Sequence, residues 1–222
     1  MKTKGIAVIF DMDGVIVHND YFHCLAWQKF SHENNIEVST EQIKSWFGNT
    51  NATILQNLFG NGLKPEEIIK MAFRKESIYR ELYSAEIAPV RGLIDFLDEL
   101  KRNHIPVALA TAAPVENVNF VLNATKTVSY FKTIIDESQI TSGKPSPEIF
   151  LKAAEALNIA PSRCVVFEDS FFGIIAGNKA GMKVIGVATS HDAEKLDNTV
   201  LNIPDFNGIN LGMIRNIMKS KQ

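Results

Sequence analysis

Short apolar runs separated by stretches with helical periodicity restrict the fold of this chain more than any other feature. The runs occupy residues 6–10, 105–110, 164–167 and 184–188, and a shorter run at residues 133–135 is similar. An uninterrupted apolar run of this length is typical of a strand that is buried on both faces of a parallel sheet. The sequence therefore predicts a parallel sheet of five strands.

Amphipathic helical patterns lie between these runs. Two segments repeat apolar residues at i, i+3, i+4 and i+7, the spacing that places them on one face of a helix. They are Leu93, Phe96, Leu97 and Leu100 in the first segment, and Phe150, Ala153, Ala154 and Leu157 in the second. Alternating strands and helices predict an α/β fold, an open Rossmann-like parallel sheet with helices on both faces.

Residues 18–87 interrupt this alternation. They contain helical patterns and turn signals but no apolar run that resembles a buried strand. Pro89 lies just beyond the segment, where a proline would end a helix. We expect residues 18–87 to form an all-helical cap domain, inserted into a core domain that consists of residues 1–17 and 88–222.

Charge and cysteine content exclude several classes of function. The chain has 222 residues, with 23 basic and 25 acidic side chains and a formal net charge of −2. This balance provides no broad basic surface for nucleic acid or for an anionic membrane. Cys24 and Cys164 lie far apart in the sequence, so neither a disulfide framework nor a zinc site is indicated. We expect no nucleic-acid or membrane partner and a cytoplasmic location.

Hydropathy leads to the same expectation. The apolar run at residues 6–10 ends at Asp11 and is shorter than the apolar region of a signal peptide. No window approaches the roughly 18 apolar residues that cross a bilayer. A chain of this length can bury a sizeable core, so we expect it to fold by itself, as a monomer.

Polar residues gather where the apolar runs end. In open α/β sheets, ligands bind at the carboxyl ends of the strands, so these residues are candidates for one site. The candidates are Asp11 and Asp13 after the first run, Thr111 after the second, Lys144 before the second helical pattern, and Glu168 and Asp169 after the run at residues 164–167. Asp11 and Asp13 are two apart, so both can address one substrate.

Carboxylates crowded into one crevice repel one another. The repulsion is about 1 kcal/mol per pair at 4 Å in water and several times larger at a lower dielectric constant. A cation must therefore hold them together. Oxygen ligands without histidine or cysteine favour Mg²⁺, which commonly binds one or two carboxylates and keeps water for a phosphate to replace.

Phosphoryl transfer through a carboxylate nucleophile is the chemistry that this set predicts. Mg²⁺ and Lys144 would balance the charge of the phosphoryl oxygens, and Thr111 or nearby backbone amides would bind the others. Asp13 would protonate the leaving oxygen and later deprotonate the attacking water.

The four motifs closely resemble those of the haloacid dehalogenase superfamily. They are Asp11-Met12-Asp13-Gly14, Ala110-Thr111, Gly143-Lys144-Pro145 and Glu168-Asp169-Ser170. The sequences around Lys144 and Asp169 resemble its β-phosphoglucomutase-like phosphatase branch, whose members carry a helical cap after the first motif. The resemblance implies that Asp11 is the nucleophile and Asp13 the acid and base.

The resemblance also implies the metal ligands. Mg²⁺ would be bound by Asp11, the Asp13 carbonyl and Asp169, with Glu168 at or near the metal, often through water. Phosphate would be bound by Thr111, Ala112 and Lys144.

The choice between phosphatase and mutase depends on departures from the family pattern. β-Phosphoglucomutases carry a cap lysine before, and an arginine after, a glycine that resembles Gly48, whereas this chain has Phe47 and Asn51 there. Their loop after the second strand has serine, lysine and asparagine, where residues 113–115 are Ala-Pro-Val. Without a second phosphate site, hydrolysis of a small phosphorylated metabolite, plausibly a sugar phosphate, is the predicted reaction.

Other readings stay open. His23 lies where the mutases place a cap histidine, and Asn51 lies where they place the arginine. Both residues are therefore candidates for substrate contact. A β-phosphoglucomutase is the alternative enzyme. A non-catalytic receiver domain also uses an acidic pocket and a lysine, but it needs about half this length and no helical insert.

Overall fold

The computed structural model describes residues 5–46 and 49–220. The chain divides into two compact units. The sheet unit contains the residues up to His18 together with those from Ala88 onward, and the helical unit is Asn19–Ile87. Phe47 and Gly48, which the comparison with mutases used, lie outside the described residues.

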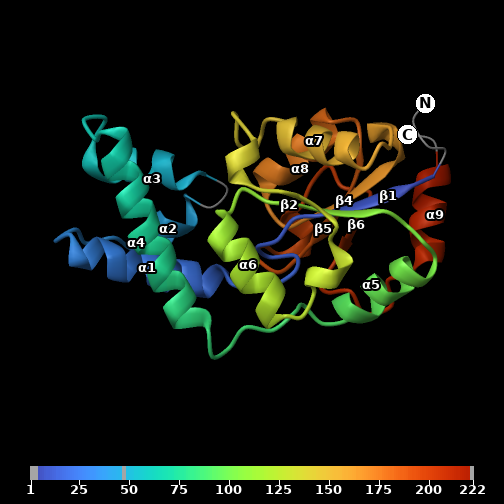
Figure 1. The fold of residues 1–222 in the computed structure, drawn as a ribbon, viewed down its shortest axis with the longest axis horizontal. Helices are drawn as coiled ribbons and strands as arrows, with labels where there is room; N and C mark the ends of the chain where they lie inside the picture. The colour runs from blue at the N-terminus through green and yellow to red at the C-terminus, as the bar shows by residue number, and fades with distance from the viewer. Residues whose placement is uncertain (1–4, 47–48, 221–222) are drawn as a thin grey trace. The chain divides into compact units, whose positions relative to one another are not determined.

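The sheet unit is built on a parallel sheet with strand order β3-β2-β1-β4-β5-β6 (Figure 1). The strands are β1 (Ala7–Phe10), β2 (Val107–Ala110), β3 (Thr133–Ile135), β4 (Cys164–Glu168), β5 (Lys183–Val187) and β6 (Leu201–Ile203). The predicted α/β parallel sheet is confirmed, and the five predicted strands all form. The sequence missed β6, because its three residues place polar Asn202 between two apolar neighbours and show no apolar run.

Strand β1 lies at the centre of the sheet. It pairs in parallel with β2 on one side and with β4 on the other, so Ile9 is level with both Ala108 and Val166. Strand β5 continues from β4 with Glu168 level with Gly186. This register brings the carboxyl ends of β2, β1, β4 and β5 to one edge in that order.

Helices cover both faces of the sheet (Figure 1). One face carries α7 (Glu148–Ala156) and α8 (Phe171–Lys179), and the other carries α5 (Leu93–Arg102), α6 (Val115–Ala124) and α9 (Leu211–Lys219). Short 3₁₀ turns occupy Val128–Tyr130, Glu137–Gln139, Pro161–Arg163 and Ala193–Lys195. Among the described residues, no helix has the combined length and apolar character that crossing a membrane requires.

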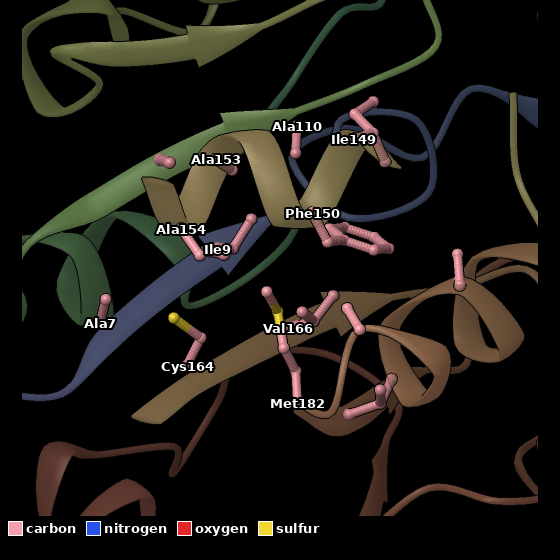
Figure 2. Close-up of a cluster of buried hydrophobic side chains, with 14 of the residues drawn as sticks. Ala7, Ile9, Ala110, Ile149, Phe150, Ala153, Ala154, Cys164, Val166 and Met182 are labelled. Atoms are coloured by element: carbon pink, nitrogen blue, oxygen red, sulfur yellow. The ribbon is translucent and has the colours of Figure 1, made fainter. Parts of the chain in front are cut away.

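Alternate residues of the central strands enter two separate cores. Ile9 and Val166 pack with Phe150 of α7 in the cluster that Figure 2 shows. Their neighbours Phe10 and Phe167 stack on the opposite face, with ring centroids 5.2 Å apart. This alternation is the two-residue period of a strand, and it explains why residues 7–10 and 164–167 are apolar at every position.

The predicted apolar helix faces point into these cores. Leu93, Phe96, Leu97 and Leu100 of α5 are all buried. In α7, Phe150, Ala153 and Ala154 are buried, and Leu157 just after the helix is partly buried. The i, i+3, i+4, i+7 pattern therefore identified the buried faces of both helices.

The helical unit contains four helices and no strand among its described residues. They are α1 (Asp20–Glu33), α2 (Thr40–Lys44), α3 (Asn51–Phe59) and α4 (Pro65–Tyr83). Pro65 begins α4, the position where proline costs no hydrogen bond. Helix α1 packs on α4, and Trp27 and Phe30 of α1 are buried within the unit.

Phe96 gives a test of the aromatic core. Its buried ring contacts Phe10, Phe167 and Phe206, at centroid distances of 6.2, 5.6 and 5.9 Å. We expect Phe96→Ala to lower the free energy of unfolding by about 3–5 kcal/mol, because it removes a buried ring and leaves a cavity. Urea unfolding followed by circular dichroism measures the change.

The matched control is Val128→Ala, which shortens an exposed side chain in the same unit. This change should alter the free energy of unfolding by about 0.5 kcal/mol or less. Equal effects of the two substitutions would contradict the assigned core.

Candidate active site

Lys144 joins two of the strand-end carboxylates. Asp11 directly follows β1, and Glu168 is the last residue of the neighbouring β4. The Lys144 Nζ lies 2.8 Å from Asp11 Oδ1 and 2.7 Å from Glu168 Oε2. All three side chains are buried. The structure therefore brings residues from the ends of two strands and from one loop into a single buried, ion-paired centre.

Asp169 completes an acidic cluster with Asp11 and Glu168. Each of these buried residues offers a carboxylate oxygen, and the three oxygens all lie within 4.8 Å of one another. Lys144 supplies one positive charge to three carboxylates. The cluster is therefore anionic when all three are ionised, and a divalent cation would balance the excess.

The pKa values reflect this imbalance. Burial, followed by the charge of Glu168, raises the pKa of Asp11 to about 8, although Lys144 opposes the shift. Burial and the charges of Glu168 and Asp11 also raise the pKa of Asp169 well above its usual range. Burial alone would lower the pKa of Lys144, but Asp11 and Glu168 outweigh it and raise that pKa, so the ammonium stays protonated.

Glu168 is held from both sides. Its Oε1 accepts hydrogen bonds from the Ser170 backbone N–H at 3.1 Å and the Ser170 hydroxyl at 2.7 Å, while Oε2 accepts from Lys144. Ser170 also caps α8 by accepting from the Gly173 N–H. A Cβ on Gly173 would lie 1.9 Å from Glu168 Cδ, so this helix can start beside the carboxylate only with glycine there.

The turn after β1 packs directly on Asp169. Gly14 has a φ of +76°, and a Cβ at this position would lie 1.9 Å from Asp169 Oδ2. Asp13, half-buried in the same turn, is close enough for its charge to raise the pKa of Asp11. Among the described residues, the acidic cluster does not include the Asp13 side chain. The family resemblance had implied only the Asp13 backbone carbonyl as a metal ligand.

Thr111 and Ala112 lie in the loop after β2, the strand beside β1. Thr111 is buried, and its backbone N–H donates to Ile135 O at 2.9 Å. Its Oγ1 accepts from the Ala113 N–H at 3.1 Å, which shapes the loop rather than capping the next helix. Ala112 is half-buried beside it. The next helix, α6, begins later, at Val115.

Glu148 fixes the loop that carries Lys144. Its carboxylate accepts hydrogen bonds from Thr141 N at 3.1 Å, Thr141 Oγ1 at 3.0 Å and Ser142 N at 2.8 Å. The bond from the Thr141 backbone, then the Lys152 ammonium at 3.1 Å and the bond from the Ser142 backbone, lower the pKa of Glu148 to about 2. Sequence reasoning gave Glu148 no function, because its partners are chosen by the loop conformation.

Thr189 and Ser190 are further residues that the sequence did not single out. Ser190 Oγ donates a hydrogen bond to Asp169 Oδ2, and Thr189 Oγ1 donates to Gly14 O at 2.5 Å. Both follow β5, so reading the residues after the run at 184–188 as strand-end residues would have found them.

His23 and Asn51 belong to a polar cluster inside the helical unit. Lys75 Nζ donates to His23 Nδ1 at 2.8 Å and forms an ion pair with Glu76 Oε1 at 2.8 Å. The Asn51 side-chain amide donates to the same Glu76 oxygen at 2.8 Å. Lys75 and Glu76 are only 2% and 4% exposed. The sequence missed both, since charged residues on a helix are usually solvated.

Comparison with known proteins identifies related chains. Residues 8–187 match the family described as haloacid dehalogenase-like hydrolase. Validoxylamine A 7'-phosphate phosphatase of Streptomyces hygroscopicus subsp. limoneus is 26% identical over 85% of this chain and 88% of its own. β-Phosphoglucomutase of Bacillus subtilis (strain 168) is 31% identical over 82% of both chains.

A solved structure shows the same fold. The HAD hydrolase of family IA, variant 3, from Entamoeba histolytica superimposes with a TM-score of 0.89 and 28% sequence identity. The match covers 97% of this chain and all of the other.

Glu148 gives a pH-dependent test of the lysine loop. Its pKa is depressed from an ordinary value of 4.5 to about 2, so its contribution to stability is complete above pH 4.5 and is lost as the pH falls toward 2. We expect Glu148→Gln to lower the melting temperature at pH 7, and the gap from the wild type to close toward pH 2–3. Thermal unfolding between pH 2.5 and 7 measures it.

Glu155→Gln, an exposed position at the end of the same helix, is the control. Its difference from the wild type should be small and should vary little with pH. A Glu148→Gln gap that stays constant over the whole pH range would contradict the role of the carboxylate.

Proposed function

Since the chain belongs to the haloacid dehalogenase-like hydrolase family, we propose that it is a Mg²⁺-dependent phosphatase. Its substrate is a small phosphorylated metabolite of the sugar phosphate kind. The observation that carries the proposal is the contact between Asp11, Lys144 and Glu168 at the carboxyl ends of β1 and β4. It supports a carboxylate nucleophile beside a fixed positive charge, the combination that attack on an anionic phosphate ester needs.

The residues present fit a magnesium ion. The cluster of Asp11, Glu168 and Asp169 offers only oxygen ligands, is buried, and carries more negative charge than Lys144 balances. Such a hard, anionic donor set suits Mg²⁺. Asp11, Asp169 and the Asp13 carbonyl would hold the ion, with Glu168 beside it. When bound, Mg²⁺ polarises the phosphoryl group and balances its charge.

The side chains then divide the reaction between them. Asp11 attacks phosphorus, a bond from its carboxylate oxygen to phosphorus forms, and the bond from phosphorus to the ester oxygen breaks. Asp13 gives its proton to the departing oxygen, so the leaving group is released as an alcohol. Lys144 balances charge on the transferred group, while Thr111 and Ala112 bind its remaining oxygens.

Hydrolysis of the aspartyl phosphate reverses the role of Asp13. The ionised Asp13 takes a proton from a water molecule, and the resulting hydroxide forms a bond to phosphorus. The bond from phosphorus to Asp11 breaks, which releases inorganic phosphate and restores the Asp11 carboxylate. Asp13 is protonated again for the next turnover.

The polar cluster of the helical unit favours a phosphatase over a mutase. Asn51, which stands where mutases have an arginine, donates to the carboxylate of Glu76. Lys75, a basic residue of this unit, is paired with the same carboxylate, so their charges cancel. A neutral cluster offers little attraction for a second phosphate. It suits a hydroxyl-bearing leaving group, and we assign His23 and Asn51 to its recognition.

The 31% identity to the Bacillus subtilis β-phosphoglucomutase keeps the mutase as the second candidate. The helical unit, Asn19–Ile87, would serve as the cap domain that was predicted for residues 18–87, and it would select the substrate in either case. We further propose that the enzyme is a cytoplasmic monomer without nucleic-acid or membrane partners.

Asp11→Asn tests the nucleophile. An amide cannot form the aspartyl phosphate, so we expect the rate of p-nitrophenyl phosphate hydrolysis with Mg²⁺ to fall on the order of 10⁴-fold or more. Asp98→Asn, at a carboxylate of α5 that accepts a hydrogen bond from Tyr130, is the control and should keep the wild-type rate. Wild-type turnover by Asp11→Asn would refute the mechanism.

A coupled assay separates the two candidate reactions. With β-glucose 1-phosphate as substrate, we expect phosphate release without sustained formation of glucose 6-phosphate. The reason is that Asn51 is uncharged and the positive charge of Lys75 is balanced by Glu76, so a second phosphate is not attracted there. Glucose 6-phosphate formation that exceeds phosphate release would instead assign the mutase. Glucose 6-phosphate dehydrogenase and a phosphate-detecting dye follow the two products in parallel.

A further inference from the structure

We propose that Thr189 and Ser190, in the loop after β5, are positioning residues that set how tightly the acidic cluster binds a divalent cation. The inference rests on the proposed function, because it concerns the same metal site. It goes beyond that function in assigning a role to a loop outside the four motifs. Neither residue would touch the phosphoryl group, and both would act through the residues that hold the metal.

Ser190 acts on Asp169. Its hydroxyl donates to Asp169 Oδ2, and the carboxylate is buried. A carboxylate that has one oxygen fixed by a hydroxyl loses freedom to rotate about its side-chain bonds. Such outer partners commonly orient metal ligands, and their loss costs about 10- to 100-fold in metal affinity.

Thr189 acts on the turn after β1. Its hydroxyl donates to Gly14 O at 2.5 Å, and Gly14 directly follows Asp13, whose carbonyl is a proposed metal ligand. The same glycine packs against Asp169, because a Cβ there would lie 1.9 Å from Asp169 Oδ2. Two adjacent hydroxyls therefore fasten two segments, at Gly14 and Asp169, that lie far apart in the sequence.

The loop that carries both hydroxyls starts from a fixed position. Strand β5 is paired with β4 on one side and with β6 on the other. Beyond the strand, Ala188 N donates to Ile203 O at 2.7 Å, and Thr189 N donates to Val187 O at 3.0 Å. These backbone bonds place Thr189 and Ser190 independently of any metal, so the hydroxyls can hold the ligands in place before an ion arrives.

A purely structural role predicts a different result from a positioning role. If the hydroxyls only stabilised the fold, their removal would lower thermal stability and leave cation affinity unchanged. If they position the metal ligands, removing them lowers the affinity for the cation, while thermal stability and the maximal rate at saturating Mg²⁺ change little. Direct binding measurements therefore separate the two roles.

The experiment titrates metal-free protein with MgCl₂ by isothermal calorimetry, in the absence of substrate. We expect Ser190→Ala to weaken binding about tenfold and Thr189→Val, which keeps the side-chain size, about threefold. Ser190→Thr, which keeps the hydroxyl, should restore affinity to within about twofold of the wild type. Titration with Mn²⁺, followed by electron paramagnetic resonance, provides a second measurement, and it should rank the variants by affinity in the same order.

Ser138→Ala is the matched control. Ser138 Oγ donates to Asp136 Oδ1 at 2.6 Å, so this variant removes the same serine-to-aspartate bond outside the acidic cluster. It should bind Mg²⁺ with wild-type affinity. If Ser190→Ala does not fold, Thr189→Val carries the test.

Wild-type Mg²⁺ affinity in both Ser190→Ala and Thr189→Val would overturn the inference and leave the proposed phosphatase intact. Absence of Mg²⁺ and Mn²⁺ binding by the wild-type protein would instead overturn both the metal-dependent function and the inference. Weakened binding together with an unchanged Asp11-dependent rate at saturating Mg²⁺ would support both.

Discussion

The candidate site depends on the buried ion pairs that the Lys144 ammonium makes with Asp11 and Glu168. These carboxylates lie at the ends of two neighbouring strands, so both ion pairs can form only when β1 and β4 pair in the observed register. Removing one partner from a buried ion pair leaves an uncompensated charge, which typically costs 3–5 kcal/mol. Lys144, Asp11 and Glu168 therefore constrain one another, and Glu148 holds the loop that delivers the lysine. The remaining excess of negative charge is the reason that this centre suits a metal.

The sequence predicted the fold well because both faces of the sheet are covered. Burial on both faces makes residues 7–10 of β1 and 164–167 of β4 apolar at every position, and this signal does not depend on knowing the partner strands. It fails for β6, whose central Asn202 has a specific local use: its amide donates to Ala193 O and Leu196 O. From the sequence alone, a strand of three residues with a polar residue at its centre cannot be distinguished from a loop.

The candidate site was partly predictable for a related reason. Residues at strand ends share one edge of a parallel sheet, so Asp11 and Glu168 could be grouped before any contact was known. Ser190 follows β5 and could have been grouped in the same way, although its bond to Asp169 could not have been foreseen. Glu148 could not be grouped in this way, because its hydrogen bonds depend on the conformation of the loop that carries Lys144. Lys75 and Glu76 were missed because the sequence does not show that a charged pair on α4 is buried. Adjacent opposite charges on a helix are normally solvated, and only the tertiary packing reveals this exception.

The central place of β1 has a consequence for how the protein forms. This strand, early in the sequence, pairs on both sides, with β2 and β4, and β4 begins only at Cys164. During synthesis, Ala7–Phe10 therefore emerges long before its neighbours and must wait with its backbone unpaired and its apolar side chains uncovered. Non-local pairing of this kind slows folding, and exposed strand edges favour aggregation. The placement that puts Asp11 at the middle of the sheet thus leaves the nascent chain prone to aggregation until β4 has been made.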